Sequence, residues 1–205
     1  MIFIQVLLVA MLVSFLGSIP PGTINVSVMQ LSIQGHRKAA LSLGLGAAIM
    51  EFMYSGVTVY FQQYLTSNPN LTHYFQFVTA TVLVVIGLGN LFSKVTSKSF
   101  KSTETVRKRM SFRKGIMLGL LNPLTIPYWL SVTTYLDLNG WIQLDGFNFW
   151  MYVSGISLGT FTLMISVDLL GNRFQKVADN PFLVHKVPGI ILLSMGLYNF
   201  YQLFF

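Results

Sequence analysis

The chain of 205 residues is 53% hydrophobic, 9% charged and carries a net charge of +7, a composition that excludes an ordinary soluble domain. It contains no cysteine, which excludes disulfides, thiol redox chemistry and thiolate metal sites. The apolar residues come in long runs rather than in alternating segments, so the sequence predicts an all-α integral membrane protein.

Six hydrophobic stretches are long enough to span a bilayer. Turn-forming polar residues separate them, and two of the six are interrupted by proline or glycine. The predicted transmembrane helices cover residues 2–34 (interrupted), 39–61, 72–92, 112–136 (interrupted), 147–170 and 187–205. We therefore divide the chain into three spans over 1–93, a basic linker over 94–111 and three further spans over 112–205.

The basic residues lie in alternate connections between the predicted spans. All 13 Lys and Arg residues fall in or beside the first, third and fifth connections, and the second and fourth contain none. By the positive-inside rule, the three basic connections face the cytoplasm and both termini face outside. The net charge therefore reflects membrane topology, which argues against nucleic acid as a partner.

Each group of three spans opens with an interrupted helix that carries a similar motif. The letters PGTI at 21–24 resemble PLTI at 123–126, and an asparagine lies beside each motif, at Asn25 and Asn122. Because three is an odd number, the second group must enter the membrane from the opposite side. The sequence thus predicts two inverted three-helix repeats with interrupted helices 1 and 4.

The two breaks are candidate binding sites. A proline break leaves backbone groups without partners, which lipid cannot supply, and exposes a half-helix amino terminus that suits a carboxylate. A plain proline kink explains either break alone equally well, but their pairing favours a site. The asparagines can serve either the backbone or a bound solute. The predicted lining residues are Pro21, Gly22, Thr23, Asn25, Asn122, Pro123 and Thr125.

Glu51 lies halfway along the second span, where an ionised carboxylate is costly and usually faces a cavity or a partner. Such an acid can exchange a proton or pair with an ammonium group, although a protonated structural glutamate is the alternative. Tyr54 shares its helix face and is assigned to the same site. Asp168 is a second coupling candidate, but an interfacial ion pair with the nearby Arg173 is an equal alternative.

Other residue patterns favour structural roles. The small residues around Gly44 and Gly46 predict close helix packing and permit a homodimer without requiring one. Tyr128 and Trp129 can line a path, although lipid contact is the commoner role for such aromatic residues. The three histidines fall in or near separate connections, so the sequence predicts no metal site and no cofactor.

Two stretches resemble the lysine exporter (LysE) family of amino-acid translocators: PPGTINVSVMQLSIQGHRKAALSLGLGAAIMEF at 20–52 and FRKGIMLGLLNPLTIPYWLSV at 112–132. The resemblance implies a six-helix bacterial inner-membrane exporter of amino acids or related small solutes, energised by the proton gradient. The family's usual Pro-Gly-Pro-Asn appears at 21–25 without its second proline and with one residue more. This departure concerns the identity of the solute more than the fold.

The preferred mechanism is alternating access, in which one three-helix unit rocks against the other around the breaks. Two other readings remain open. A metal-cation exporter would use Glu51 and Asp168 as oxygen ligands. A non-transporting membrane scaffold would use the basic segment 94–114 as its working surface. An enzyme is not expected, because the chain has no nucleophile-and-base or paired-aspartate motif.

Overall fold

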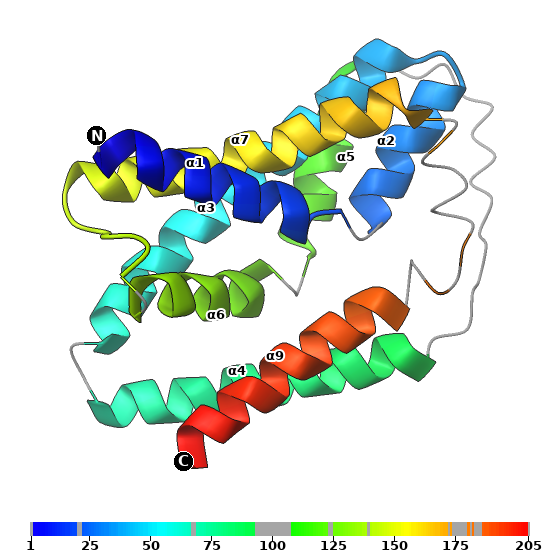
Figure 1. The fold of residues 1–205 in the computed structure, drawn as a ribbon. Coiled ribbons are helices and arrows are strands. Elements are labelled where there is room, and N and C mark those ends of the chain that lie inside the picture. Colours follow the sequence, from blue (N-terminus) through cyan, green and yellow to red (C-terminus); the bar gives the residue numbers. More distant parts are fainter. Residues whose placement is uncertain are drawn as a thin grey trace.

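The computed structural model is an assembly of helices (Figure 1). It describes residues 2–19, 22–66, 69–92, 108–122, 125–138, 140–171, 173, 180, 182 and 186–204, and these ranges contain no strand. The helices are α1 (Ile2–Gly17), α2 (Thr23–Ile33), α3 (Arg37–Thr66), α4 (Pro69–Phe92), α5 (Lys108–Leu120), α6 (Thr125–Leu138), α7 (Phe147–Leu169) and α9 (Val187–Phe204). The prediction of an all-helical protein is confirmed.

The two spans predicted to be interrupted correspond to the helix pairs α1–α2 and α5–α6. Each pair is separated close to its predicted break, and the chain bends by 64° between α5 and α6. Within the described residues, α3 (over Arg37–Gln62) and α7 are each long and apolar enough to cross a membrane, and α5 with α6 can form a third span. The chain is therefore a multi-pass membrane protein. Pro21, Pro123 and most of the predicted linker lie outside the described residues.

Three helix pairs dominate the packing (Figure 1): α1 with α7, α3 with α5, and α4 with α9. Glycines allow the backbones to approach closely. A Cβ atom at Gly155 of α7 would lie 2.5 Å from the carbonyl oxygen of Leu7, and one at Gly119 of α5 would lie 2.7 Å from Cβ of Met50. Interfaces built in this way are held by van der Waals contact, which is the main source of helix association in lipid.

The small-residue face of α3 is occupied by helices of the same chain. A Cβ atom at Gly44 would lie 2.7 Å from Cβ of Met164 on α7, and one at Gly46 would overlap the carbonyl oxygen of Phe112 on α5. The expectation of close packing is thus met inside the molecule. The residues that permitted a homodimer consequently provide no argument for one.

The buried core forms two clusters, and α3 and α7 contribute to both. The first joins these helices to α1 and α6, around Trp129, Tyr152 and Ile156. The second joins them to α2, around Val28, Leu43 and Met164. The two long helices are therefore the scaffold on which the four half-helices pack.

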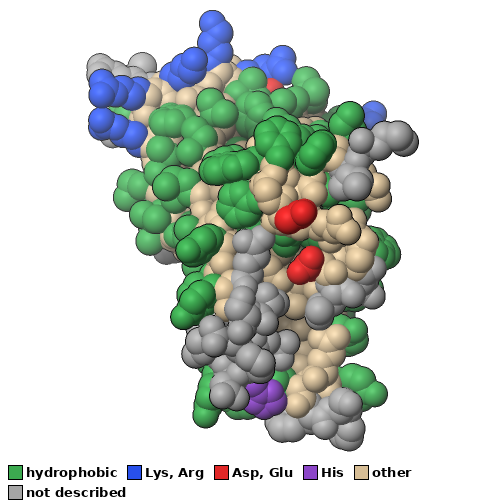
Figure 2. Space-filling model, turned by 90° about the vertical axis from the view of Figure 1, so that its left-hand side faces the viewer, with side chains coloured by type: hydrophobic (Ala, Val, Ile, Leu, Met, Phe, Trp, Pro, Cys, Tyr) green, Lys and Arg blue, Asp and Glu red, His purple; other side chains and the backbone are tan. Residues whose placement is uncertain are grey.

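The described lysines and arginines are all exposed, and Figure 2 shows such side chains gathered at one end of the visible face, with hydrophobic side chains over much of the rest. Figure 1 shows the beginning of α1 and the end of α9 on one side of the molecule, and the α2–α3 turn on the other. This separation of charge from the apolar body is typical of a protein with one basic side at a membrane. The residues concerned are Arg37, Lys38, Lys108, Arg109, Arg113, Lys114, Arg173 and Lys186.

Candidate functional site

The mid-helix acid Glu51 is bound to the helix that begins at the second break. Its Oε1 atom accepts a hydrogen bond of 2.5 Å from Nε1 of Trp129. Trp129 lies on α6, one turn after this helix begins at Thr125, and is only 1% exposed. The lipid-facing interpretation of Trp129 is therefore wrong, because its polar N–H is used inside the protein, as buried tryptophans usually require.

Tyr128 connects this pair with the first break. Its ring packs edge-on against Trp129, with the ring centroids 5.0 Å apart. Its hydroxyl group lies against Gly17, the last residue of α1, where a Cβ atom would overlap it. On α6, Trp129 thus contacts Glu51 of α3, and its neighbour Tyr128 contacts the end of α1. Sequence reasoning missed this juxtaposition, although Gly17 directly before a break was a usable signal.

Side chains cap the helices that end at the two breaks. The amide Nδ2 of Asn25 donates a hydrogen bond of 2.7 Å to the carbonyl oxygen of Ser18, across the first break. The hydroxyl group of Tyr54 donates one of 2.6 Å to the carbonyl oxygen of Leu120, at the second. Both carbonyl groups lack a helical partner because the helix stops there, and lipid could not satisfy them. In this structure, Asn25 and Tyr54 therefore serve the backbone.

Among the described residues, no side chain caps the amino terminus of α2. The N-cap residue is Gly22, and none of the described atoms outside its own helix turn lies within 4 Å of the place where a Cβ atom would be. Gly22 and Thr23 are both exposed. A helix amino terminus without a cap presents N–H groups and a partial positive charge, an arrangement that suits an anion.

At the second break, the chain turns through Asn122 and α6 begins at Thr125. The backbone N–H of Asn122 donates to the carbonyl oxygen of Gly119 at 3.1 Å, which ends α5. Thr125 is 4% exposed, and its hydroxyl group has no hydrogen-bond partner among the described residues. Thr125 and Trp129 are four residues apart and share a face of α6. An unsatisfied hydroxyl group therefore lies one turn from the Glu51 contact.

Asp168 belongs to a different cluster, at the end of α7. Its Oδ2 atom lies 3.0 Å from both Nε and Nη2 of Arg37, the first residue of α3. The ion-pair alternative therefore holds, but with Arg37 rather than with Arg173. Glu51 and Asp168 have separate partners, and no group of three or more His, Cys, Asp or Glu residues gathers in the described part of the chain. The oxygen ligands that a cation exporter would need are thus not assembled by these two acids.

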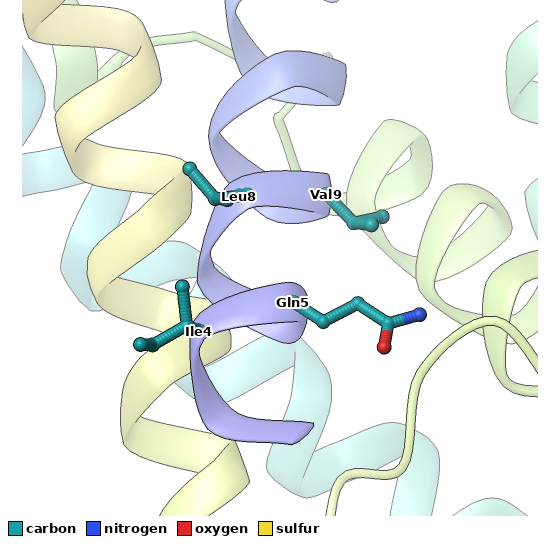
Figure 3. Close-up of a pocket in the computed structure, with 4 residues that line it drawn as sticks. All are labelled: Ile4, Gln5, Leu8 and Val9. Carbon is teal, nitrogen blue, oxygen red and sulfur yellow. The ribbon is translucent and has the colours of Figure 1, made fainter. Parts of the chain in front are cut away.

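An open hollow of about 370 Å³ also lies along α1 (Figure 3). Ile4 and Leu8 point to one side of the helix, whereas Gln5 and Val9 point to the other, so the four side chains do not converge. Gln5 supplies the only polar side chain among them. This hollow has the character of a lipid-facing surface, because a solute site needs several converging polar groups.

A multi-pass helical membrane protein that holds a mid-helix carboxylate beside two interrupted helices has the construction of a membrane transporter. The sequence model of the LysE type translocator family matches residues 15–203, and the chain belongs to this family. Membership confirms the resemblance seen in the two motif stretches. It also confirms that the chain is not an enzyme, since the family is one of transporters.

Among known proteins, the chain is similar to the "Putative amino acid efflux protein YcgF" of Bacillus subtilis (strain 168). It is 25% identical over 191 residues, which cover 90% of each of the two chains. No solved structure matches this protein. The family match spans both breaks, Glu51 and Asp168, and together with this relative it supports export of small solutes as the function of the chain.

Proposed function

We propose that this protein is a secondary active transporter of the bacterial inner membrane that exports amino acids or related small solutes by proton-coupled alternating access. The observation that carries the proposal is the hydrogen bond between Glu51 and Trp129, beside both breaks, in a member of a translocator family. The class of solute follows the name of the relative from Bacillus subtilis.

The helix pairings support two inverted three-helix repeats, over 1–93 and 112–205. The first half-helix of each repeat packs on the long helix of the other: α1 on α7, and α5 on α3. The last helices of the two repeats, α4 and α9, pack together. If each helix is replaced by its counterpart in the other repeat, the same pairings result. This is expected of a transporter built from an inverted repeat. With the basic side in the cytoplasm, both termini face outside.

The groups at the breaks suit the two charges of an amino acid. The uncapped amino terminus of α2, at Gly22 and Thr23, and the amino terminus of α6, at Thr125, can accept a carboxylate. Glu51 can accept the ammonium group in place of the Trp129 N–H. Pro21, Asn122 and Pro123 are assigned to the interruption of the two helices, while Asn25 and Tyr54 keep the freed carbonyl groups satisfied.

Competition at Glu51 supplies the coupling. A carboxylate in a membrane interior is stabilised either by a cation or by a proton, because the bare charge is costly. A solute ammonium and a proton cannot both occupy the same oxygen atoms. A proton that arrives from outside therefore releases the solute, and the protonated carrier returns to the cytoplasm to exchange its proton for the next solute.

Uptake by inverted membrane vesicles with an acidic lumen tests the proposal. A labelled amino-acid panel is supplied to wild type, to Glu51→Gln, and to Asp145→Asn as the matched control. Asp145 is an exposed acid of the α6–α7 connection, hydrogen-bonded to Asn148 at 3.2 Å. Both substitutions exchange a carboxylate for an amide, so only the position differs.

We expect gradient-dependent accumulation of at least one amino acid in wild type and Asp145→Asn, and its loss in Glu51→Gln. No accumulation of any panel member would refute amino-acid export. Gradient-dependent accumulation that persists in Glu51→Gln would refute the coupling role of Glu51. Intrinsic fluorescence of the purified variants checks that each one is folded.

A further inference from the structure

The Arg37–Asp168 ion pair lies in an open hollow of about 450 Å³ between the end of α2, the beginning of α3 and the end of α7. Ser32, Arg37, Asp168 and Arg173 provide its polar lining. The volume falls within the range of about 300 to 1,000 Å³ that is typical of small-molecule sites. Because the surrounding connections are basic, this hollow faces the cytoplasm in the topology proposed above.

The turn that presents Arg37 has a defined geometry. Gly35 has a φ of +80°, the N–H of His36 bonds the carbonyl oxygen of Leu31 at 2.8 Å, and that of Gly35 bonds Ser32 at 2.9 Å. This is a Schellman motif, which ends α2 and sets the direction of α3. The hydroxyl group of Ser32 also donates to the backbone oxygen of Asp168 at 2.7 Å. The backbone that carries Arg37 and Asp168 is therefore held in place on both sides of the hollow, whereas the Arg37 side chain is free to move.

The carboxylate of Asp168 is only half satisfied. Its side chain is 1% exposed, and both nitrogen contacts from Arg37 go to the same oxygen atom, Oδ2. The other oxygen, Oδ1, is buried and has no hydrogen-bond partner within the described ranges. A buried unpaired acceptor on a charged group is costly, and an ammonium group with three donors would satisfy it. Arg37, by contrast, is 59% exposed and can turn to another anion.

We propose that this hollow is the cytoplasmic capture site for a zwitterionic amino acid. Asp168 binds the solute ammonium group, and Arg37, assisted by Arg173, binds the solute carboxylate. The choice of an amino acid rests on the function proposed above, whereas the pairing of opposite charges is a property of the hollow itself.

Both charges of the solute are needed because Arg37 and Asp168 must each exchange the other for a new partner. Withdrawal of Arg37 would leave the buried charge of Asp168 without compensation, which is strongly unfavourable. A zwitterion supplies a cation to Asp168 and an anion to Arg37 in one step, so the net charge of the hollow does not change. A solute with only one of these charges leaves one side of the pair unpaired.

Protection from labelling measures occupancy of the hollow without requiring transport. The chain has no cysteine, so Leu170→Cys, at an exposed position in the lining, provides a single thiol. Met110→Cys, exposed at the start of α5, provides the control thiol. Inverted vesicles are treated with a membrane-impermeant maleimide in the presence of each member of an amino-acid panel. The amide and the N-acetyl derivatives of the protecting amino acid are tested next.

We expect the intact amino acid to protect Leu170→Cys but not Met110→Cys, and both derivatives to protect poorly. Asp168→Asn should raise the half-protecting concentration by about tenfold or more, as loss of a charged hydrogen bond implies. The double variant Arg37→Gln with Asp168→Asn leaves no unpaired buried charge, and should fold but lose protection. Lys38→Gln, an exposed neighbour with the same loss of charge as Arg37→Gln, should behave like the parent protein.

The outcomes separate this inference from the proposed function. Gradient-dependent uptake without protection would overturn the capture site and leave amino-acid export intact. If neither gradient-dependent uptake nor protection from labelling is observed, both proposals are overturned. Equal protection by the amide or the N-acetyl derivative would overturn recognition of the zwitterion.

Discussion

Substitution of Gly159 by alanine tests the contact between α1 and α7. The new Cβ atom would overlap the carbonyl oxygen of Met11 and lie 2.8 Å from Cβ of Ser14. The hydroxyl group of Ser14 bonds the carbonyl oxygen of Ile156 at 2.7 Å and the hydroxyl group of Thr160 at 3.0 Å, so this part of α1 has little freedom to move aside. The obstacle is backbone, which cannot escape by changing rotamer.

The expected loss follows from two opposing effects. Overpacking costs about 1 to 3 kcal/mol, and a backbone obstacle places Gly159→Ala at the upper end. Alanine in a helix recovers roughly 0.5 to 1 kcal/mol relative to glycine. The net loss of unfolding free energy is therefore about 2 kcal/mol.

Gly56→Ala is the matched control, because it makes the same change in the other long helix. Its Cβ atom would lie 3.8 Å from Cγ1 of Val153, an ordinary contact. We expect this variant to gain roughly 0.5 to 1 kcal/mol, so that the two differ by about 3 kcal/mol. Reversible unfolding in mixed detergent micelles, followed by tryptophan fluorescence, measures the difference. Equal stability of the two variants would refute the packing of α1 on α7.

Three further substitutions test the site and the turn. Trp129→Phe keeps a ring but removes the donor that holds Glu51 in the empty carrier, so proton leak should lower gradient-dependent accumulation about tenfold or more; unchanged accumulation would show that the bond is dispensable. Gly17→Ala places a Cβ atom on the Tyr128 hydroxyl group and should reduce transport, with partial rescue by adding Tyr128→Phe; no rescue would contradict this contact. Gly35→Ala, at φ +80°, should lower stability in the same micelle assay by about 1 kcal/mol, and an unaltered transition would rule out strain there.

The positions of the helices could be predicted because the signals that set them are local. Long apolar runs mark the helices, and Pro-Gly near residue 22 and Asn-Pro near residue 123 mark the breaks, since proline removes a helical donor wherever it lies. Glu51 could be singled out for an equally local reason, the cost of an acid within an apolar helix. No knowledge of the packing was needed for these predictions.

The partners of these residues could not be predicted, because they are far apart in the chain. Trp129 is 78 residues from Glu51, and Arg37 is 131 residues from Asp168. From the sequence, the ion-pair partner predicted for Asp168 is Arg173, because Arg173 is its neighbour in the chain. Helix periodicity places Tyr54 on the face of Glu51 but does not reveal that its hydroxyl group reaches the end of α5. Which face meets which helix depends on tertiary packing.

Each of the two acids, Glu51 and Asp168, is held by a donor side chain from the other half of the chain. Glu51 on α3 is bound by Trp129 of the second half, and Asp168 on α7 is bound by Arg37 of the first half. Each tie joins the two halves through one carboxylate and one donor side chain. On the proposed mechanism, a solute ammonium group displaces the donor at either acid and so removes a contact between the halves. The solute would therefore loosen the carrier where it binds, whereas an empty carrier keeps both ties and resists the motion that would leak protons.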